Sequence, residues 1–290
     1  MKIIITGLHG YISNSLKKYI NEVDSTWEIE LLNLRNSEWK EKDFSSVDCV
    51  VHTTALVHKN EREHTIEEYR EINTYLTEEL AKKCKKDGVK QFVFLSTEAV
   101  YGVASSCFHK VLIDETTCLN PRTKYGITKL EAEQSLQEIA SPEFTVTIIR
   151  PPMVYGANCT GNYVKLRQIV LKLGIIPTLQ FDRSFIYIDN LCALIYNLIK
   201  TQNGGIYCPQ NLPAISTYEM IELIALSHGK KFLECSFLNP LIKIGSIKIS
   251  ALHKAFGSLK YSEKMSVFDE YYQVVNPYES IVKTEKEWKD

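Results

Sequence analysis

The sequence lacks any long uncharged apolar segment. No stretch approaches the run of about 18 apolar residues that a helix needs to cross a bilayer, so no transmembrane span is predicted. The first apolar run, residues 2–6, is too short for the core of a signal peptide, and Gly7 interrupts it. We therefore expect a cytoplasmic protein.

The sequence also lacks an excess of charge of either sign and any cysteine motif. Lys and Arg number 34 and Asp and Glu number 35, so no strong field attracts nucleic acid or an anionic membrane. The eight cysteines are scattered, with no Cys-x-x-Cys pair and no cluster with histidine. This spacing argues against a zinc site and against a secreted disulfide framework, and we expect no metal centre.

What the chain does contain is an alternation of short apolar runs with longer segments of helical periodicity. Hydrophobic residues make up 44% of its 290 residues, enough for a sizeable core. This alternation predicts right-handed βαβ crossovers and an α/β fold of the Rossmann type, with a doubly wound parallel sheet. The predicted strands are 2–6, 28–34, 47–52, 91–96 and 144–150, and the predicted helices are 10–22, 61–86 and 123–141.

The alternation weakens after about Gly156, where short helical and strand pieces follow. We expect residues 1–156 to form a dinucleotide-binding domain, which a segment around 183–200 rejoins. Residues 157–290 are expected to form a smaller C-terminal substrate-binding lobe. In doubly wound sheets ligands bind beyond the carboxyl ends of the strands, so the residues after each predicted strand are the candidates for chemistry.

Residues 6–13, TGLHGYIS, lie between a predicted strand and a predicted helix. Glycines at positions 7 and 10 allow a tight turn and a close approach to a pyrophosphate, and the helix N-terminus offers N–H groups to the anion. Ser13 replaces the last glycine of the usual T-G-x-x-G-x-x-G pattern and is small enough to fit. The expected cofactor contacts in this turn are Gly7, His9, Gly10, Tyr11 and Ile12.

The end of the second predicted strand lacks the carboxylate that usually holds the ribose 2′-hydroxyl of NAD. It reads LNLRN over residues 32–36, and Arg35 can pair with the 2′-phosphate of NADP. The alternative is that Arg35 is a plain surface residue. We favour NADP(H) as the cofactor and keep NAD(H) as the alternative.

Tyr125 and Lys129 are four residues apart near the start of a predicted helix, hence on one face of it. Tyrosine is mostly protonated at neutral pH, but a neighbouring cation stabilises the phenolate and lowers its pKa. Tyr125 is therefore a candidate general acid and base, and Lys129 can also donate to a nicotinamide ribose. A Tyr-x-x-x-Lys pair alone is common by chance.

Residues 96–102, STEAVYG, support this pair because they follow a predicted apolar strand. Thr97 is expected at the carboxyl end of the sheet, where its hydroxyl can bond a substrate oxygen and assist proton transfer. The alternative is that Thr97 only caps the helix that follows.

Taken in order, these segments resemble the extended short-chain dehydrogenase/reductases that act on nucleotide sugars. The resemblance covers about residues 1–200 and also rests on residues 51–55 (VHTTA), on Asn73 with Thr77, and on residues 150–156 (RPPMVYG). It implies that Thr97, Tyr125 and Lys129 match the catalytic triad. The cofactor contacts that it implies are Gly7, Gly10, Thr53, Ala55, Asn73, Pro152 and Val154, with Tyr125 and Lys129.

The resemblance also implies substrate contacts. Arg183 matches a position that often grips the substrate diphosphate, and it is the last arginine of the chain. A second, later arginine of many relatives is thus absent, and Lys230 or Lys231 is the candidate substitute, as a less directional charge. The other expected substrate contacts are Thr97, Glu98, Tyr125 and Asn162, and His58 or Lys59 is a further candidate to approach the sugar.

Three reactions share this framework: 4-epimerisation, 4,6-dehydration and 4-keto reduction. Dehydratases carry Asp-Glu after the threonine, whereas this chain has Glu98 and Ala99, which disfavours dehydration. Residues 150–156, 161–163 and 175–177 are similar to bacterial 4-reductases of UDP-4-keto-6-deoxy-N-acetylhexosamines, which make UDP-N-acetylquinovosamine or UDP-N-acetylfucosamine for surface polysaccharides. We expect such a reductase. The alternatives are a UDP-hexose 4-epimerase and, more distantly, an inactive nucleotide-sensing protein.

Residues 241–264 hold five lysines and many aliphatic residues, with no acid before Glu263. We expect a covering helix of the C-terminal lobe here, and a membrane-surface amphipathic helix is the alternative. The expected partner is a small-molecule UDP-sugar, without nucleic acid or firm membrane contact. Because relatives often dimerise through the helix that carries Tyr125, the resemblance implies a homodimer.

Overall fold

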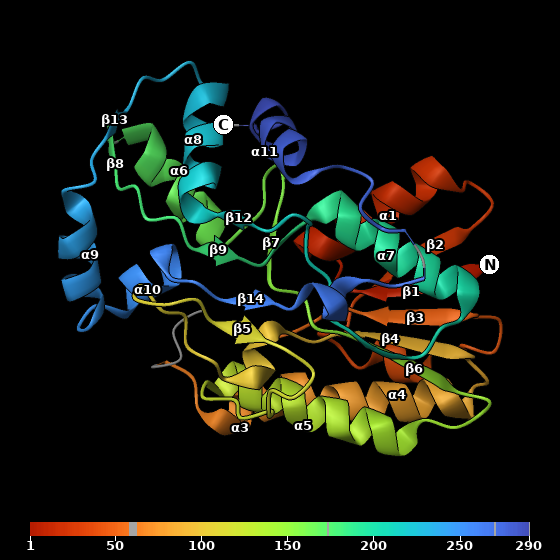
Figure 1. Cartoon of the computed structure of the whole chain (residues 1–290). Coiled ribbons are helices and arrows are strands. Elements are labelled where there is room, and N and C mark those ends of the chain that lie inside the picture. Colours follow the sequence, from red (N-terminus) through yellow and green to blue (C-terminus); the bar gives the residue numbers. More distant parts are fainter. Residues whose placement is uncertain (58–62, 173, 270, 290) are drawn as a thin grey trace.

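A six-stranded sheet lies at the centre of the protein in the computed structural model, which describes residues 1–57, 63–172, 174–269 and 271–289 (Figure 1). The strands run in the order β2-β1-β3-β4-β6-β11, and all neighbouring pairs are parallel. The expected Rossmann-type α/β fold is thus confirmed. The strand bounds are β1 Lys2–Thr6, β2 Glu28–Leu32, β3 Cys49–His52, β4 Gln91–Leu95, β6 Thr145–Ile149 and β11 Gly205–Tyr207.

Helices cover both faces of this sheet, because successive side chains of a strand point to opposite sides. In β1, Ile3 and Ile5 belong to one buried apolar cluster and Ile4 belongs to another. The first cluster includes residues of α1 and α7, and the second includes residues of α2, α4 and α5. The bounds are α1 Tyr11–Val23, α2 Glu38–Glu41, α4 Leu76–Lys86, α5 Lys124–Ile139 and α7 Ile188–Thr201.

The sheet grows in two directions from β1. The chain first adds β2 on one side of β1, and then places β3, β4, β6 and β11 in turn on the other side. At such a switch point the loops after neighbouring strands diverge and leave a crevice for a ligand. Here these loops are the turn after β1, with Gly7, and the loop after β3, with Thr53.

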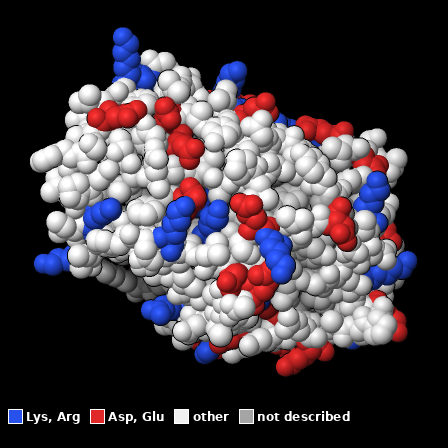
Figure 2. Space-filling model, in the orientation of Figure 1, with Lys and Arg blue, Asp and Glu red and all other residues white. Residues whose placement is uncertain are grey.

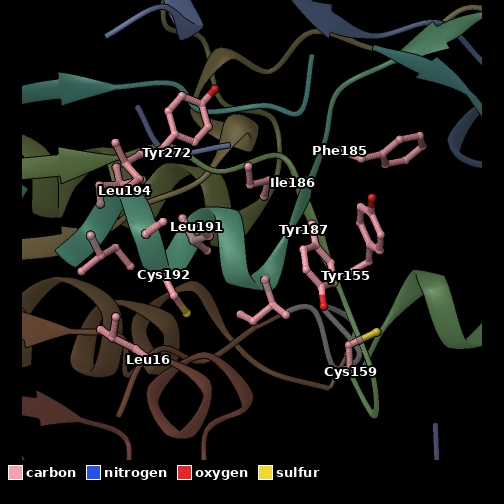
Figure 3. Close-up of a cluster of buried hydrophobic side chains, with 14 of the residues drawn as sticks. Leu16, Tyr155, Cys159, Phe185, Ile186, Tyr187, Leu191, Cys192, Leu194 and Tyr272 are labelled. Atoms are coloured by element: carbon pink, nitrogen blue, oxygen red, sulfur yellow. The ribbon is translucent and has the colours of Figure 1, made fainter. Parts of the chain in front are cut away.

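The segment around 183–200, which the sequence analysis assigned to the first domain, lies beside α1 on one face of the central sheet. The strand β10 (Phe185–Tyr187) pairs with β7 (Met153–Tyr155), and α7 then packs in the same apolar cluster as α1. Figure 3 shows Leu191 and Cys192 of α7 in this cluster together with Leu16 of α1. The edge strand β11 was not foreseen. The division of the chain at residue 156 stays a prediction.

The C-terminal lobe is built from short elements beside the sheet (Figure 1). Its small sheets pair β12 with β9, β13 with β8, and β14 with β5 (Leu112–Ile113) of the first part of the chain. The bounds are α6 Asn162–Lys172, β8 Ile175–Ile176, β9 Asp182–Arg183, β12 Ile215–Ser216, α8 Thr217–Ser227, β13 Leu233–Glu234, α9 Leu238–Ser246, α10 Ser250–Phe256, β14 Lys260–Tyr261, η3 Glu263–Ser266 and α11 Pro277–Lys286.

One buried carboxylate joins three helices of this lobe. Glu285 on α11 accepts hydrogen bonds from the Tyr163 hydroxyl at 2.6 Å and from Arg167 Nε at 2.8 Å, both on α6. It also lies 2.8 Å from Nε2 of His228, directly after α8. The Arg167 guanidinium lies 4.6 Å from the ring centroid of Trp288. Glu285 therefore fastens the last helix to the lobe.

We expect Glu285→Gln to destabilise the protein, because it removes a buried carboxylate charge that Arg167 and His228 both contact. Breaking a buried ion pair costs about 3–5 kcal/mol, so the free energy of unfolding in urea should fall by roughly that amount. Glu287→Gln, at an exposed position of the same segment, is the matched control and should change it by less than about 0.5 kcal/mol. Equal losses in the two variants would contradict this role.

Candidate active site

The turn after β1 has the geometry of an anion cradle. Gly7 has a φ of +96°, a conformation that favours glycine, and a Cβ there would lie 3.0 Å from Thr53 Oγ1. Gly10 precedes α1 without a side chain to cap it, so the first N–H groups of the helix lack an intrahelical acceptor. Ser13 is buried and donates to the carbonyl oxygens of Gly7 and Gly10. These features fit a dinucleotide pyrophosphate.

A buried hydroxyl behind this turn joins β1 to the loop after β3. Thr6 Oγ1 accepts from the backbone N–H groups of Thr53 at 3.0 Å and Thr54 at 3.2 Å, and lies 2.9 Å from His52 Nδ1. Thr53 Oγ1 donates in turn to the Thr6 carbonyl at 2.6 Å. Burial, with the nearby charge of Lys129, lowers the pKa of His52 to about 3, so its ring is neutral. The network sets the spacing of the two loops.

The side chain of Asn73, a predicted cofactor contact, also holds the loop after β3. Its Oδ1 accepts from the Leu56 N–H at 2.8 Å, and its Nδ2 donates to the Leu56 carbonyl and to Thr128 Oγ1, both at 3.1 Å. The amide is therefore occupied in tying the loop after β3 to α5. Asn73 lies in a π-helical turn, Glu71–Tyr75 (η1), between α3 (Ile66–Arg70) and α4, and such turns are frequent at functional sites.

Thr97, Tyr125 and Lys129 come together at the carboxyl end of β4. The Thr97 side chain hydrogen-bonds the Tyr125 hydroxyl. Lys129 is one turn further along α5, and its Nζ lies 3.8 Å from the ring centroid of Phe94 in β4. A Cβ at Gly126 would lie 2.7 Å from the Ala99 carbonyl oxygen, so glycine permits the close approach of α5 to the segment after Thr97.

Thr97 caps a helix, which was the alternative role that the sequence offered, and its hydroxyl also contacts Tyr125. Its Oγ1 accepts from the Ala99 N–H at 3.2 Å and so caps the 3₁₀ turn Glu98–Tyr101 (η2). The same hydroxyl bonds the phenol of Tyr125. The cap therefore orients the hydroxyl at the site.

Burial dominates the pKa values of this group. It raises the pKa of Tyr125 to about 12, although the hydrogen bond from Thr97 lowers it. It lowers the pKa of Lys129 to about 7, although the charge of Glu133 raises it. The net shift of the phenol's pKa is therefore upward and not downward as the sequence predicted, because burial disfavours the charged form of both groups. Tyr125 carries its proton at neutral pH.

Glu133, one turn beyond Lys129 on α5, is a functional residue that the sequence analysis missed. Its buried carboxylate accepts from Arg150 Nη2 at 2.6 Å and Nε at 3.1 Å, and from the Ser96 hydroxyl. Arg150 Nη1 also donates to the Tyr101 hydroxyl at 2.9 Å. This network joins α5 to the ends of β4 and β6. A sequence signal for Glu133 does exist: Tyr125, Lys129 and Glu133 follow one another at intervals of four residues, which places them on one face of the helix.

Glu98 and Arg183, two predicted substrate contacts, face one another. Burial raises the pKa of Glu98 to about 7, although the charge of Arg183 lowers it. Burial also lowers the pKa of Arg183, whose Nη1 donates to the Gly257 carbonyl at 3.2 Å. Within the described residues, Glu98 Oε2 is buried without a hydrogen-bond partner. The Glu98 N–H donates to the Pro151 carbonyl at 3.0 Å and joins this pair to residues 151–154.

The structure does not bring every predicted residue to this group. Asn162 is exposed at the first position of α6, and Lys230 donates to the Leu171 carbonyl. Pro152 is buried and Val154 half-buried, the latter pairing with Ile186 in β7 and β10.

The other predicted contacts lie near the two loops at the switch point. His9 is exposed in the turn after β1, where Tyr11 and Ile12 begin α1 half-buried. Ala55 is half-buried in the loop after β3, and Arg35 is exposed after β2. His58 and Lys59 lie outside the described residues.

No helix within the described part of the chain is long and apolar enough to cross a membrane. The described residues also contain no group of three or more His, Cys, Asp or Glu side chains that could hold a metal ion.

We expect Glu133→Gln to lower the pKa of Lys129 below its value of about 7, because the variant removes the charge that raises it. The ammonium is then lost at a lower pH. The measurement is an NMR titration of the Lys129 side chain in the isolated protein. Glu131→Gln, whose carboxylate pairs with Arg70 at 2.8 Å, is the matched control and should leave the pKa unchanged. An unchanged pKa in Glu133→Gln would contradict the coupling.

The sequence matches known proteins over most of the chain. The model of the NAD dependent epimerase/dehydratase family matches residues 3–208. UDP-glucose 4-epimerase of Vibrio cholerae is 32% identical over 194 residues, which cover 61% of this chain and 58% of that protein. N-acetyl-alpha-D-glucosaminyl-diphospho-ditrans,octacis-undecaprenol 4-epimerase of Escherichia coli O157:H7 is 29% identical over 201 residues, which cover 67% and 59%. The chain thus spans just under three fifths of the length of these two relatives.

The fold is similar to those of solved structures. The UDP-N-acetylglucosamine 4-epimerase of Bacillus cereus has a TM-score of 0.75 at 18% identity, over 100% of both chains. The dTDP-4-dehydrorhamnose reductase of Bacillus anthracis, in complex with NADP, has a TM-score of 0.65 at 20% identity, over 80% of this chain and 82% of that one. These identities establish the fold alone. Because the family model spans residues 3–208, the chain belongs to the NAD-dependent epimerase/dehydratase family of extended short-chain dehydrogenase/reductases.

Proposed function

We propose that the protein reduces the C4 ketone of a UDP-4-keto-6-deoxy-N-acetylhexosamine with NAD(P)H. The product is UDP-N-acetylquinovosamine or UDP-N-acetylfucosamine, for surface polysaccharide. The observation that carries the proposal is the Tyr125 phenol, which bonds Thr97 and keeps its proton because its pKa is about 12. A ketone that accepts hydride becomes an alkoxide, and a protonated phenol beside it can supply the proton.

Each residue of the proposed triad has a distinct task. The hydroxyls of Thr97 and Tyr125 are bonded to one another, so both can reach a single ketone oxygen. Tyr125 then donates its proton to that oxygen as negative charge develops. The Lys129 ammonium, where present, stabilises the resulting phenolate, and the buried Glu133 favours that ammonium. The bound nicotinamide supplies the hydride.

The nucleotide cofactor fits the switch point of the sheet. We assign its pyrophosphate to the turn of Gly7, His9 and Gly10 with the start of α1, and its ribose to the loop of Thr53 and Ala55. Pro152 and Val154, beside Glu98, are assigned to the nicotinamide end. We favour NADP(H) because the exposed Arg35 follows β2 where NAD enzymes carry an acid. NAD(H) is the alternative.

The sugar nucleotide is assigned to the side of Thr97 that Glu98 and Arg183 line. The Arg183 guanidinium is suited to a diphosphate, because it presents several donors in a fixed plane. The Glu98 carboxyl, with its pKa raised to about 7, is suited to exchange hydrogen bonds with sugar hydroxyls. Asn162 stays a predicted contact. A dehydratase is disfavoured because Ala99 provides no second carboxyl group.

A UDP-hexose 4-epimerase is the second candidate, favoured by the name of the Vibrio cholerae relative. The Escherichia coli relative is also named a 4-epimerase, of a lipid-linked sugar. A UDP-hexose 4-epimerase would use the same triad, but Tyr125 would have to remove a proton as well as return one. The protonated phenol is the state from which a reductase starts.

We expect incubation with UDP-4-keto-6-deoxy-N-acetylglucosamine and NADPH, or NADH, to consume the cofactor in proportion to substrate. NMR of the product should show a new carbinol at C4. Interconversion of UDP-hexoses without added reductant would favour the epimerase instead. Turnover in neither assay would contradict both enzymatic proposals.

We expect Tyr125→Phe to lose about 10²–10⁴-fold in turnover, because proton transfer by a positioned side chain contributes about that much. Nucleotide binding, followed by calorimetry, should survive. Tyr278→Phe, at an exposed position of α11, is the matched control and should keep full activity. Full activity in Tyr125→Phe would remove this residue from the reaction.

We expect Arg35→Asp to weaken NADPH binding by about 10–100-fold, because a hydrogen bond to a charged group contributes about 1.5–3 kcal/mol. NADH binding should be kept or improved. Lys18→Asp is the control, because Lys18 is an exposed cation elsewhere, on α1. It should change the binding of neither NADPH nor NADH. Equal effects of Arg35→Asp on NADPH and NADH would overturn the preference for NADP.

A further inference from the structure

The outer edge of the C-terminal lobe carries an apolar stripe along α9. The side chains of Phe237, Leu241, Ile244 and Ile247 are 77, 56, 66 and 69% exposed. Their spacing of three and four residues places them on one face of a helix. Ile247 has helical backbone angles, so the stripe runs from the residue before α9 to the residue after it.

The opposite side of α9 is anchored to the lobe. Asn239 Oδ1 accepts from the Thr178 N–H and its Nδ2 donates to Thr178 Oγ1, both at 3.0 Å. Ser246 is buried, and the backbone at Gly245 approaches Leu252 of α10, since a Cβ there would lie 3.0 Å from its Cδ1. These contacts fix the outward orientation of the stripe. The helix does cover the lobe, but its outer face is itself apolar.

The same lobe has further exposed apolar side chains, among them Leu233 and Ile175. These two residues are paired in β13, which precedes α9, and β8. Single exposed apolar residues are normal on a protein surface, but a contiguous patch marks a site of interaction.

The segment that carries the stripe contains lysines but no acidic residue. No Asp or Glu occurs in the 28 residues between Glu234 and Glu263, although the chain as a whole carries 35 of them in 290 residues. Lys243 and Lys248 lie within this segment, as does Lys254. The part of the left edge in Figure 2 that α9 forms in Figure 1 shows white and blue surface without red. Lysines therefore accompany the apolar stripe: Lys248 is exposed, and Lys243 is half-buried with its Nζ 6.0 Å from the ring centroid of Phe181.

A second copy of this chain fits such a surface poorly. In a twofold interface the same patch meets itself, so the lysines would find no acidic residue of this segment to pair with. An anionic lipid surface offers the opposite charge for the lysines and a hydrocarbon boundary for the leucine, isoleucine and phenylalanine side chains. We propose that the α9 stripe (Phe237, Leu241, Ile244 and Ile247, with Lys243 and Lys248) docks the protein on an anionic membrane surface.

The docking surface and the substrate side of the site share one stretch of chain. The helix α10 follows α9 and leads to Gly257, whose carbonyl accepts the hydrogen bond from Arg183. The Ser105 hydroxyl also donates to the His253 carbonyl in α10 at 2.8 Å. Docking through α9 therefore holds the substrate side of the protein near the lipid surface. Docking through α9 does not depend on which reaction the protein catalyses.

The test is sedimentation of the full chain with vesicles of phosphatidylcholine alone or of phosphatidylcholine with phosphatidylglycerol. We expect binding to the mixed vesicles to be at least about tenfold tighter and to weaken as salt is added. The double variant L241E/I244E should lose about tenfold or more, and K243E/K248E should lose a similar factor. V23E, at the exposed end of α1, is the matched control and should bind as the unchanged protein does.

The melting temperature and nucleotide binding of the stripe variants should equal those of the unchanged protein. This control would show that the variants keep the fold. Absence of binding to the mixed vesicles, or equal binding by L241E/I244E, would overturn the proposal. Analytical ultracentrifugation provides the other decisive outcome. A dimer that L241E/I244E converts to a monomer would show that a second copy covers the stripe, and would also overturn it.

Discussion

The buried Glu133 carboxylate is the interaction on which the site depends. It accepts hydrogen bonds from Arg150 and Ser96, and its charge raises the pKa of Lys129, which burial lowers. A buried guanidinium and a buried ammonium without a compensating anion would be strongly destabilising. The Glu133 carboxylate therefore allows the cations of Arg150 and Lys129 to be buried near the ends of β4 and β6. It also helps to hold α5 in the position where Tyr125 contacts Thr97.

The protonation states of other residues in the site follow from their burial. Burial keeps the Tyr125 phenol protonated and the His52 ring neutral, so the first can donate a proton and the second serves as a fixed hydrogen-bonding bridge. Asn73 ties the loop after β3 to the same helix. Because these polar groups bond one another, the loops that would hold a nucleotide are positioned by the protein alone.

The C-terminal lobe adds charge and surface to this frame. Its Arg183 faces Glu98 from the first part of the chain, and Glu285 holds the lobe's last helix in place. The apolar stripe of α9 lies on the outer side of the same lobe. The lobe thus carries both the proposed substrate contacts and the proposed lipid contact.

The sequence by itself determined the order of strands and helices, the glycine turn, the place of Thr97 after a strand and the shared helix face of Tyr125 and Lys129. These features are local, because backbone periodicity and helix geometry decide them within a few residues. Tertiary structure decided the Glu133–Arg150 and Glu98–Arg183 pairs, the internal role of Asn73, the edge strand β11 and the direction of each pKa shift. Those depend on which distant segments bury a group, and no spacing along the chain contains that information.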